Sequence, residues 1–135
     1  MNIKDFKVGQ EVCLFITESN YNYRYMKDDN GNVPIEKRII HTTITNVGKK
    51  YITVEHGCGT KFDATDNFRQ VTNYSPDYML YTSVQAIYDQ MEANRLYNIL
   101  RDAVYYGGTN CTYTVEQMRE VIRILNIKIL NIKED

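Results

Sequence analysis

The 135-residue chain has no tryptophan, only two prolines and three cysteines, and no long apolar run. A helix that crosses a bilayer needs about 20 apolar residues, so we expect none here. No apolar core of a signal peptide follows Met1. The odd, widely spaced cysteines Cys13, Cys58 and Cys111 favour reduced thiols over a disulfide framework. These absences predict a cytoplasmic protein with no membrane partner.

The sequence also lacks an excess of charge of either sign. Its formal net charge is −1, and neither residues 1–81 nor residues 82–135 carry a basic surplus. A protein that depends on phosphate contacts usually has a basic domain, because counterion release drives that binding. The balanced charge therefore argues against nucleic acid as the main partner without excluding it.

Motifs for metal binding and catalysis are missing as well. His41, His56 and Cys58 lie near one predicted hairpin, but strand alternation turns the two imidazoles to opposite faces. Cys111 is the only cysteine in a loop exposed enough for a nucleophile, and no pattern brings a base to it. We therefore expect no metal, no cofactor and no enzymatic activity, and a thiol enzyme built on Cys111 is the weakest hypothesis.

What the sequence does contain is a strong hairpin signal in residues 39–55. This stretch is rich in β-branched residues and has a single glycine, Gly48, near its middle. A three-residue loop that ends at a left-handed Gly48 predicts a register with Ile40 opposite Val54. One face is then apolar (Ile40, Thr42, Ile44, Ile52 and Val54), and the other carries His41, Thr43, Tyr51 and Thr53.

Other short strands are predicted on either side of this hairpin. Residues 12–17 read as a strand with two apolar faces, one formed by Val12, Leu14 and Ile16 and the other by Cys13 and Phe15. Residues 18–37 suggest a twisted hairpin at the barrel edge. Residues 60–65 and 67–72 are short strands anchored by Phe62, Phe68 and Val71. Five or more such strands predict a small antiparallel β-barrel over residues 1–75.

Helical periodicity replaces strand alternation after Pro76, so residues 76–135 are predicted to form a helical segment packed on the barrel. Capping boxes start helices at Thr82 and Thr114. The first helix has two apolar groups about a quarter-turn apart, so it either packs on two surfaces in succession or kinks near Ala93. These groups are Val84, Ile87, Tyr88 and Met91, then Leu96, Ile99, Leu100, Ala103 and Val104.

Three stretches together resemble a known family. They are Phe6-Lys7-Val8-Gly9-Gln10-Glu11-Val12, Thr45-Asn46-Val47-Gly48-Lys49-Lys50-Tyr51-Ile52-Thr53-Val54 and Thr114-Val115-Glu116-Gln117-Met118-Arg119. The chain is similar to small proteins of phages and mobile elements described as a β-barrel domain of unknown function. The resemblance implies an α+β fold, in which a Src-homology-type barrel precedes a helical hairpin, and a phage origin. It transfers no catalytic or binding residues.

The 12 tyrosines are the most unusual feature of the composition. In an extended segment, Tyr21, Tyr23 and Tyr25 share one face, with Arg24 and Arg38 nearby. Tyrosine and arginine are enriched at hot spots of protein interfaces, and bases also stack on such rings. The rings could instead simply cover the barrel. These five residues are the candidate partner-binding site.

The sequence thus favours a non-enzymatic interaction protein of phage or prophage origin. It would bind, and so inhibit, a host protein or ribonucleoprotein in the host cytoplasm, with antiviral defence included. The alternative is a protein that binds nucleic acid or a nucleotide through the tyrosine-rich face. The C-terminal apolar surface also predicts a homodimer. Its expected interface residues are Met118, Ile122, Leu125 and Ile129.

Overall fold

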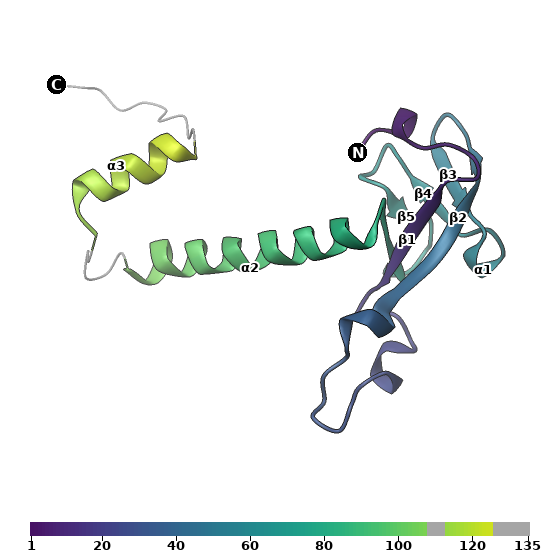
Figure 1. Ribbon diagram of the computed structural model, residues 1–135, viewed down its shortest axis with the longest axis horizontal. Coiled ribbons are helices and arrows are strands. Elements are labelled where there is room, and N and C mark those ends of the chain that lie inside the picture. The colour runs from purple at the N-terminus through teal and green to yellow at the C-terminus, as the bar shows by residue number, and fades with distance from the viewer. Residues whose placement is uncertain (108–112, 126–135) are drawn as a thin grey trace. The chain divides into compact units, whose positions relative to one another are not determined.

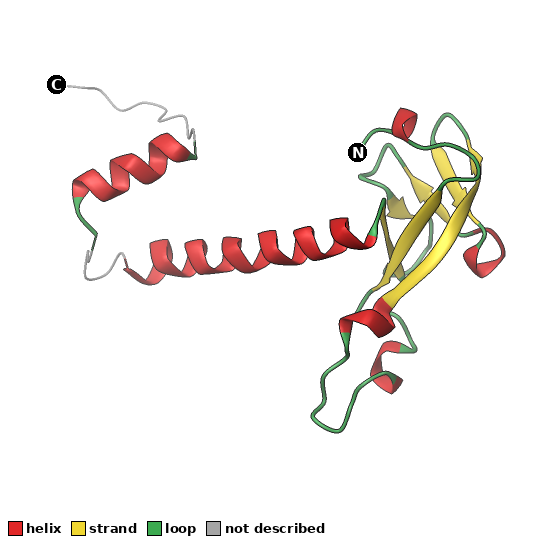
Figure 2. Ribbon diagram, in the orientation of Figure 1, coloured by secondary structure: helices red, strands yellow, loops and turns green. Residues whose placement is uncertain are grey.

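The computed structural model describes residues 1–107 and 113–125 of the chain (Figures 1 and 2). The chain divides into two compact units, Met1–Met91 and Glu92–Asp135. The first unit holds every described strand, and the second holds most of helix α2 and all of helix α3. Within the described residues, no helix is both long and apolar enough to span a membrane.

The first unit is built on a six-stranded antiparallel sheet with the order β5-β4-β3-β2-β1-β6. The strands are β1 (Glu11–Ile16), β2 (Ile39–Val47), β3 (Tyr51–Val54), β4 (Lys61–Asp63), β5 (Arg69–Gln70) and β6 (Tyr78–Tyr81). They form a nearly closed barrel, so the predicted α+β class and small antiparallel barrel are confirmed. The final strand, β6, pairs with β1 and was not predicted.

The gap between the two edge strands is bridged by one side chain. Gln70 on β5 accepts hydrogen bonds at Oε1 from the main-chain nitrogens of Asp77 and Tyr78, at 2.8 and 3.1 Å. The side-chain oxygen of Gln70 thus replaces the main-chain carbonyl of a neighbouring strand as the hydrogen-bond acceptor for two N–H groups at the start of β6. This contact holds the ends of the sheet together.

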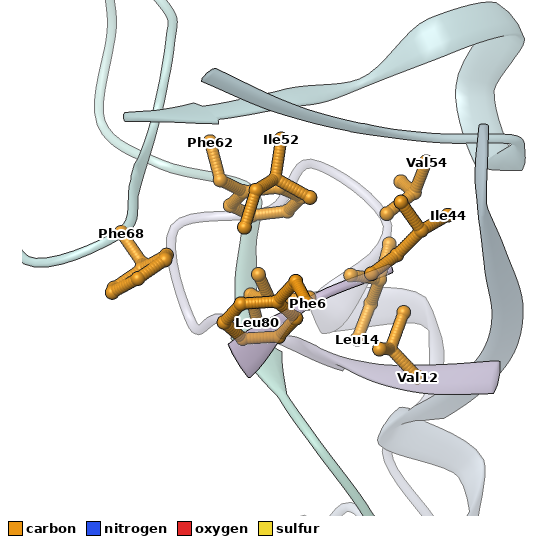
Figure 3. Packing of buried hydrophobic residues seen from close by; sticks show 9 residues of the cluster. All are labelled: Phe6, Val12, Leu14, Ile44, Ile52, Val54, Phe62, Phe68 and Leu80. Carbon is orange, nitrogen blue, oxygen red and sulfur yellow. The ribbon is translucent and has the colours of Figure 1, made fainter. Parts of the chain in front are cut away.

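The barrel interior is filled by aliphatic and phenylalanine side chains that point toward one another (Figure 3). They are Phe6, Val12, Leu14, Ile44, Ile52, Val54, Phe62, Phe68 and Leu80. The predicted anchors Phe62 and Phe68 are buried, but Val71 is 49% exposed, so its assignment as an anchor is wrong. Val71 follows Gln70, which lies opposite the buried Phe62, so strand alternation turns Val71 to the outer face.

Strand β1 is buried on both faces, as its two apolar sets predict. Its outer residues Cys13 and Phe15 pack under the first turns of α2 (Val84–Gly107), where Ile87 is only 1% exposed. The N-terminal cap of α2 differs from the prediction by one position. Ser83, rather than Thr82, accepts a hydrogen bond at Oγ from the main-chain nitrogen of Ala86, at 3.1 Å.

The central hairpin forms, but its predicted register and turn are wrong. Ile44, rather than Ile40, lies opposite Val54, and a β-bulge follows Ile44 on β2. Gly48 does not have the expected positive φ. The main-chain nitrogen of Gly48 donates to the carbonyl of Tyr51 at 2.9 Å. The central residues of the turn are therefore Lys49 and Lys50.

The faces of this hairpin are nevertheless as predicted. Ile44, Ile52 and Val54 are buried, and His41 and Tyr51 are exposed. At Val54 the displacement is four residues, which is even, and side chains alternate with a period of two, so the residues before the bulge keep their faces. Beyond the bulge the pairing shifts by one further residue, and Val47 lies opposite the buried Ile52 and packs against the core.

The helices complete the fold. Helix α2 runs through Ala93 as one 24-residue helix, and helix α3 spans Val115–Ile124. Thr114 and Gln117 form the predicted capping box at the start of α3. A single-turn element, α1, spans His56–Gly59, and a 3₁₀ turn, η1, spans Ile3–Asp5. The pairing of α2 with α3 as a hairpin and the Src-homology type of the barrel stay predictions.

Candidate partner-binding site

Residues 17–38 connect β1 to β2 and contain two 3₁₀ turns, η2 (Tyr23–Tyr25) and η3 (Ile35–Arg38), but no strand (Figure 2). The predicted twisted hairpin is therefore wrong. Its extended backbone is replaced by side-chain-to-backbone hydrogen bonds of the kind that compete with sheet ladders. Asp28 alone accepts two of them at Oδ1, from the main-chain nitrogens of Asn30 and Asn32.

Asn20 anchors the beginning of this segment to the barrel. It is the one buried polar residue among the described residues, at 8% exposure. Its Nδ2 donates to the carbonyl of Asp77 at 3.3 Å, and its Oδ1 accepts from the nitrogen of Asn22 at 2.9 Å. Thr17 adds a hydrogen bond from Oγ1 to the carbonyl of Pro76 at 2.5 Å. The segment is thus tied to the chain that enters β6.

Tyr21, Arg24 and Tyr25 form an exposed group, here named the Tyr–Arg cluster. The rings of Tyr21 and Tyr25 have their centres 5.7 Å apart, and their hydroxyl oxygens are 3.4 Å apart. The guanidinium carbon of Arg24 lies 4.7 and 4.9 Å from the two ring centres. The rings are 68% and 66% exposed, so the cluster is ordered by its own contacts and still faces solvent.

Tyr23 and Arg38 lie elsewhere, which corrects the prediction of three rings on one face. The 3₁₀ turn directs Tyr23 away from its two neighbours. The guanidinium carbon of Arg38 lies 4.9 Å from the centre of the Tyr23 ring and 4.1 Å from that of Phe15. Arg38 also donates from Nε to the carbonyl of Ile16 at 2.9 Å. The five predicted site residues therefore divide into an exposed cluster and a pair that anchors it.

The electrostatics of the cluster are set by Arg24. Among residues 1–107 and 113–125, no carboxylate forms an ion pair with this guanidinium. Hydrogen bonding to Tyr25 and then to Arg24 lowers the pKa of Tyr21, because both partners stabilise the phenolate. Residues 17–38 as a whole contain four basic and four acidic residues. The cluster thus offers one available cation on a neutral surface.

A concave feature lies apart from this cluster, where the outer face of β1 and β2 meets the start of α1. This open hollow of about 550 Å³ is lined by Glu11, His41, Thr42, Thr43, Glu55 and His56. His41 Nδ1 is 3.7 Å from the sulfur of Cys13, but burial raises the pKa of that thiol and so disfavours a reactive thiolate. His56 Nε2 instead shares a hydrogen bond with the hydroxyl of Tyr78 at 3.2 Å.

This hollow does not gather the groups that a metal centre needs. In the part of the chain that the structure describes, no three or more histidine, cysteine or acidic side chains are placed to hold a metal ion. The Tyr–Arg cluster is therefore the stronger candidate site.

The predicted oligomer interface is only partly described. Met118 and Leu125 are 40% and 52% exposed, and Ile122 is half-buried, whereas Ile129 lies outside the described residues. A second exposed apolar stripe lies on α2, where the helical periodicity of the sequence predicts packed side chains rather than an exposed surface. It comprises Leu96, Ile99, Leu100 and Val104 on α2, which are 47 to 70% exposed.

The chain matches a model of a known protein family. The family model described as "Phage ProQ C-terminal-like domain" matches residues 1–131, which is nearly the whole chain. No curated protein and no solved structure gives a significant match. The family match supports the phage association that the sequence implied.

Proposed function

The chain belongs to the family of phage ProQ C-terminal-like domains, and we propose that it is a non-enzymatic phage protein that binds a protein of the infected cell through the Tyr–Arg cluster. It acts in the host cytoplasm and inhibits a host process by occupying its partner, with antiviral defence the foremost case. The observation that carries this proposal is a pair of exposed tyrosine rings that hold Arg24, a cation without a carboxylate partner among the described residues.

The composition of the cluster supports a protein partner. Tyrosine and arginine are enriched among the residues that dominate binding energy in protein interfaces. A tyrosine also offers a large contact area at a low entropic cost, since it has only two side-chain torsions to fix. Two such rings, each about two-thirds exposed, give the cluster both apolar area and polar tips.

The cluster is also pre-organised. Asn20 ties one end of the segment to the barrel, and Arg38 holds Tyr23 against β1. Binding therefore does not have to order this turn, and less of the interaction energy is lost to conformational entropy. The two rings and the guanidinium are already in contact before a partner arrives.

These features define the chemistry of the partner surface. An aspartate or glutamate of the partner can pair with Arg24, and an apolar rim can cover Tyr21 and Tyr25. A highly charged partner is not favoured, because the basic and acidic residues of the segment are equal in number.

Single-stranded nucleic acid or a nucleotide is the second candidate. It is favoured by one observation, the exposed rings beside a guanidinium, because bases stack on aromatic and arginine planes. The absence of a basic surplus argues against it, since phosphate contacts supply much of the affinity for nucleic acid.

Affinity capture from lysate of the host cell tests the proposal. The tagged full chain is compared with Tyr21→Ala/Tyr25→Ala and with Tyr74→Ala, a matched control that removes a tyrosine 82% exposed outside the cluster. A host protein retained by the wild type and the control, but lost by the double variant, is the expected result. Equal capture by all three would refute the assignment of the site.

Nuclease treatment separates the two candidate functions. A direct protein partner stays bound after RNA and DNA are digested. A labelled single-stranded oligonucleotide that binds the wild type and the Tyr74→Ala control, but not the double variant, would instead favour the second candidate. The double variant should keep the melting temperature of the wild type, because neither of its rings is buried.

A further inference from the structure

We propose that the chain self-associates through the second half of α2, which pairs in antiparallel orientation with the same segment of a second copy. The proposal rests on an apolar stripe, on the charges beside it and on its area. It is independent of the Tyr–Arg cluster.

The stripe follows a regular helical spacing. Leu96, Ile99, Leu100, Ala103 and Val104 recur at intervals of three and four residues and so lie on one side of the helix. The first turns of α2 bury their apolar residues against the barrel, where Ile87 is 1% exposed. In the second half, Leu96, Ile99 and Leu100 are each about half exposed, and Val104 is 70% exposed.

On one flank of the stripe, the charged side chains of one copy can pair with those of a second copy. Arg95 and Asp102 are seven residues apart, so they project from the same flank, beside Ile99. In an antiparallel pair, each flank faces the same flank of the other helix. Arg95 of one copy then lies near the second copy's Asp102, and the two-fold axis makes this contact twice.

A parallel pair has no such match. It would set the Arg95 flank against the opposite flank, which carries Leu100 and Tyr97 and no carboxylate. In the single chain, Arg95 pairs with Glu92, and Asp102 pairs with Arg101. These side chains are 54 to 59% exposed, so exchange to the second copy costs little.

The area of the stripe fits a weak dimer. Its exposed side chains, with the adjacent Tyr97 at 65% exposure, offer roughly 500 Å² per copy, or about 1,000 Å² for the pair. That area is at the lower limit for a specific interface and predicts micromolar affinity. Residues 92–104 hold two basic and two acidic residues, so an anionic lipid surface or a nucleic acid is not favoured.

Helix α3 lacks the same complementarity. Its stripe around Met118 is flanked by Arg119 on one side and Gln117 on the other. Its glutamates, Glu116 and Glu120, project from the opposite side of the helix at 100° per residue. Two copies of α3 would thus gain no ion pair, which is why we assign self-association to α2.

Sedimentation velocity on the full chain, up to about 200 µM, tests the proposal. The wild type should show a monomer–dimer equilibrium. Arg95→Glu and Asp102→Arg should each raise the Kd about tenfold, because both place like charges at the two flank contacts. A 1:1 mixture of these variants should recover wild-type affinity, since the glutamate introduced in one copy then meets the arginine introduced in the other.

Arg119→Glu is the control, because it reverses an exposed charge on α3, outside the proposed interface, and should leave the Kd unchanged. A wild type that stays monomeric at the highest concentration overturns the proposal. So does a mixture that associates no better than either variant alone, since the dimer would then use another surface. Circular dichroism of each variant confirms that the helix content is unchanged.

Discussion

The guanidinium of Arg38 lies over the ring of Tyr23, with its central carbon 4.9 Å from the ring centre. This contact fixes the orientation of η2 relative to β1. With Tyr23 held toward β1, Tyr21 and Tyr25 are left on the solvent side. The orientation of the exposed cluster thus depends on a residue that does not belong to it.

Replacement of this anchor should affect both stability and binding. Arg38→Ala removes a hydrogen bond to a main-chain carbonyl and the cover over Phe15. We expect the free energy of unfolding to fall by about 1–2 kcal/mol, measured by urea denaturation. Capture of the partner should weaken as well. Lys37→Ala, an exposed neighbour, should change stability by less than about 0.5 kcal/mol. Equal effects of the two substitutions would argue against the anchor.

The two glycines at either end of β3 should respond differently to alanine. Gly57 has φ +67°, and an added Cβ would lie 2.6 Å from Thr60 Oγ1, which is held by a hydrogen bond to the carbonyl of His56. Gly57→Ala should therefore cost about 1–2 kcal/mol. At Gly48 the nearest atom to such a Cβ is at 3.5 Å and φ is not positive, so Gly48→Ala should be nearly neutral. Thermal unfolding measures the stability of both variants. A Gly48→Ala variant that is less stable than the Gly57→Ala variant would contradict this turn assignment.

The hairpin shows what the sequence can and cannot predict. The period of two predicted that Ile44, Ile52 and Val54 face the core, because alternation is a local property of an extended chain. The register depends on the turn and on the bulge after Ile44, which respond to packing across the barrel. A single glycine in the middle of the stretch was therefore a poor guide to the turn.

The candidate site was predicted in composition but not in geometry. The sequence selected Tyr21, Tyr23 and Tyr25 with two arginines, and all five side chains make ring contacts. An alternating pattern of tyrosines is compatible with an extended strand and with a short 3₁₀ turn. The buried side chain of Asn20 favours the turn, because it bonds to the backbone two residues later. Its burial depends on Asp77, which is distant in the sequence.

Closure of the barrel should depend on the side-chain oxygen of Gln70. Gln70→Ala leaves the nitrogens of Asp77 and Tyr78 without this acceptor and should lower the free energy of unfolding by about 1–2 kcal/mol. Gln70→Glu keeps an acceptor in place and should retain most of the wild-type stability at neutral pH. Chemical denaturation of the three proteins distinguishes them. A glutamate variant as unstable as the alanine variant would show that the acceptor is not what matters.

The two described cysteines should differ in reactivity. Burial raises the pKa of Cys13, which is 4% exposed, whereas Cys58 is exposed on the surface turn α1. At pH 8, iodoacetamide should modify Cys58 well before Cys13, as read by peptide mass spectrometry. A raised pKa in the folded state also means that stability is lost as the pH rises past the ordinary pKa of a thiol. Cys13→Ala should reduce that loss, and equal alkylation of the two thiols would show that Cys13 is accessible.

The ionisation of Tyr21 provides a direct test of the cluster geometry. The hydroxyl of Tyr25 and the guanidinium of Arg24 lower the pKa of Tyr21, because a phenolate accepts hydrogen bonds from both. Tyr25→Phe removes the first and larger of these contributions, so the pKa of Tyr21 should rise toward its ordinary value. NMR titration of chain labelled at the tyrosine ring carbons measures this shift. Tyr51→Phe, a change on β3 outside the cluster, should leave the pKa of Tyr21 unchanged. A Tyr21 pKa that does not respond to loss of the Tyr25 hydroxyl would mean that the two rings do not meet in solution.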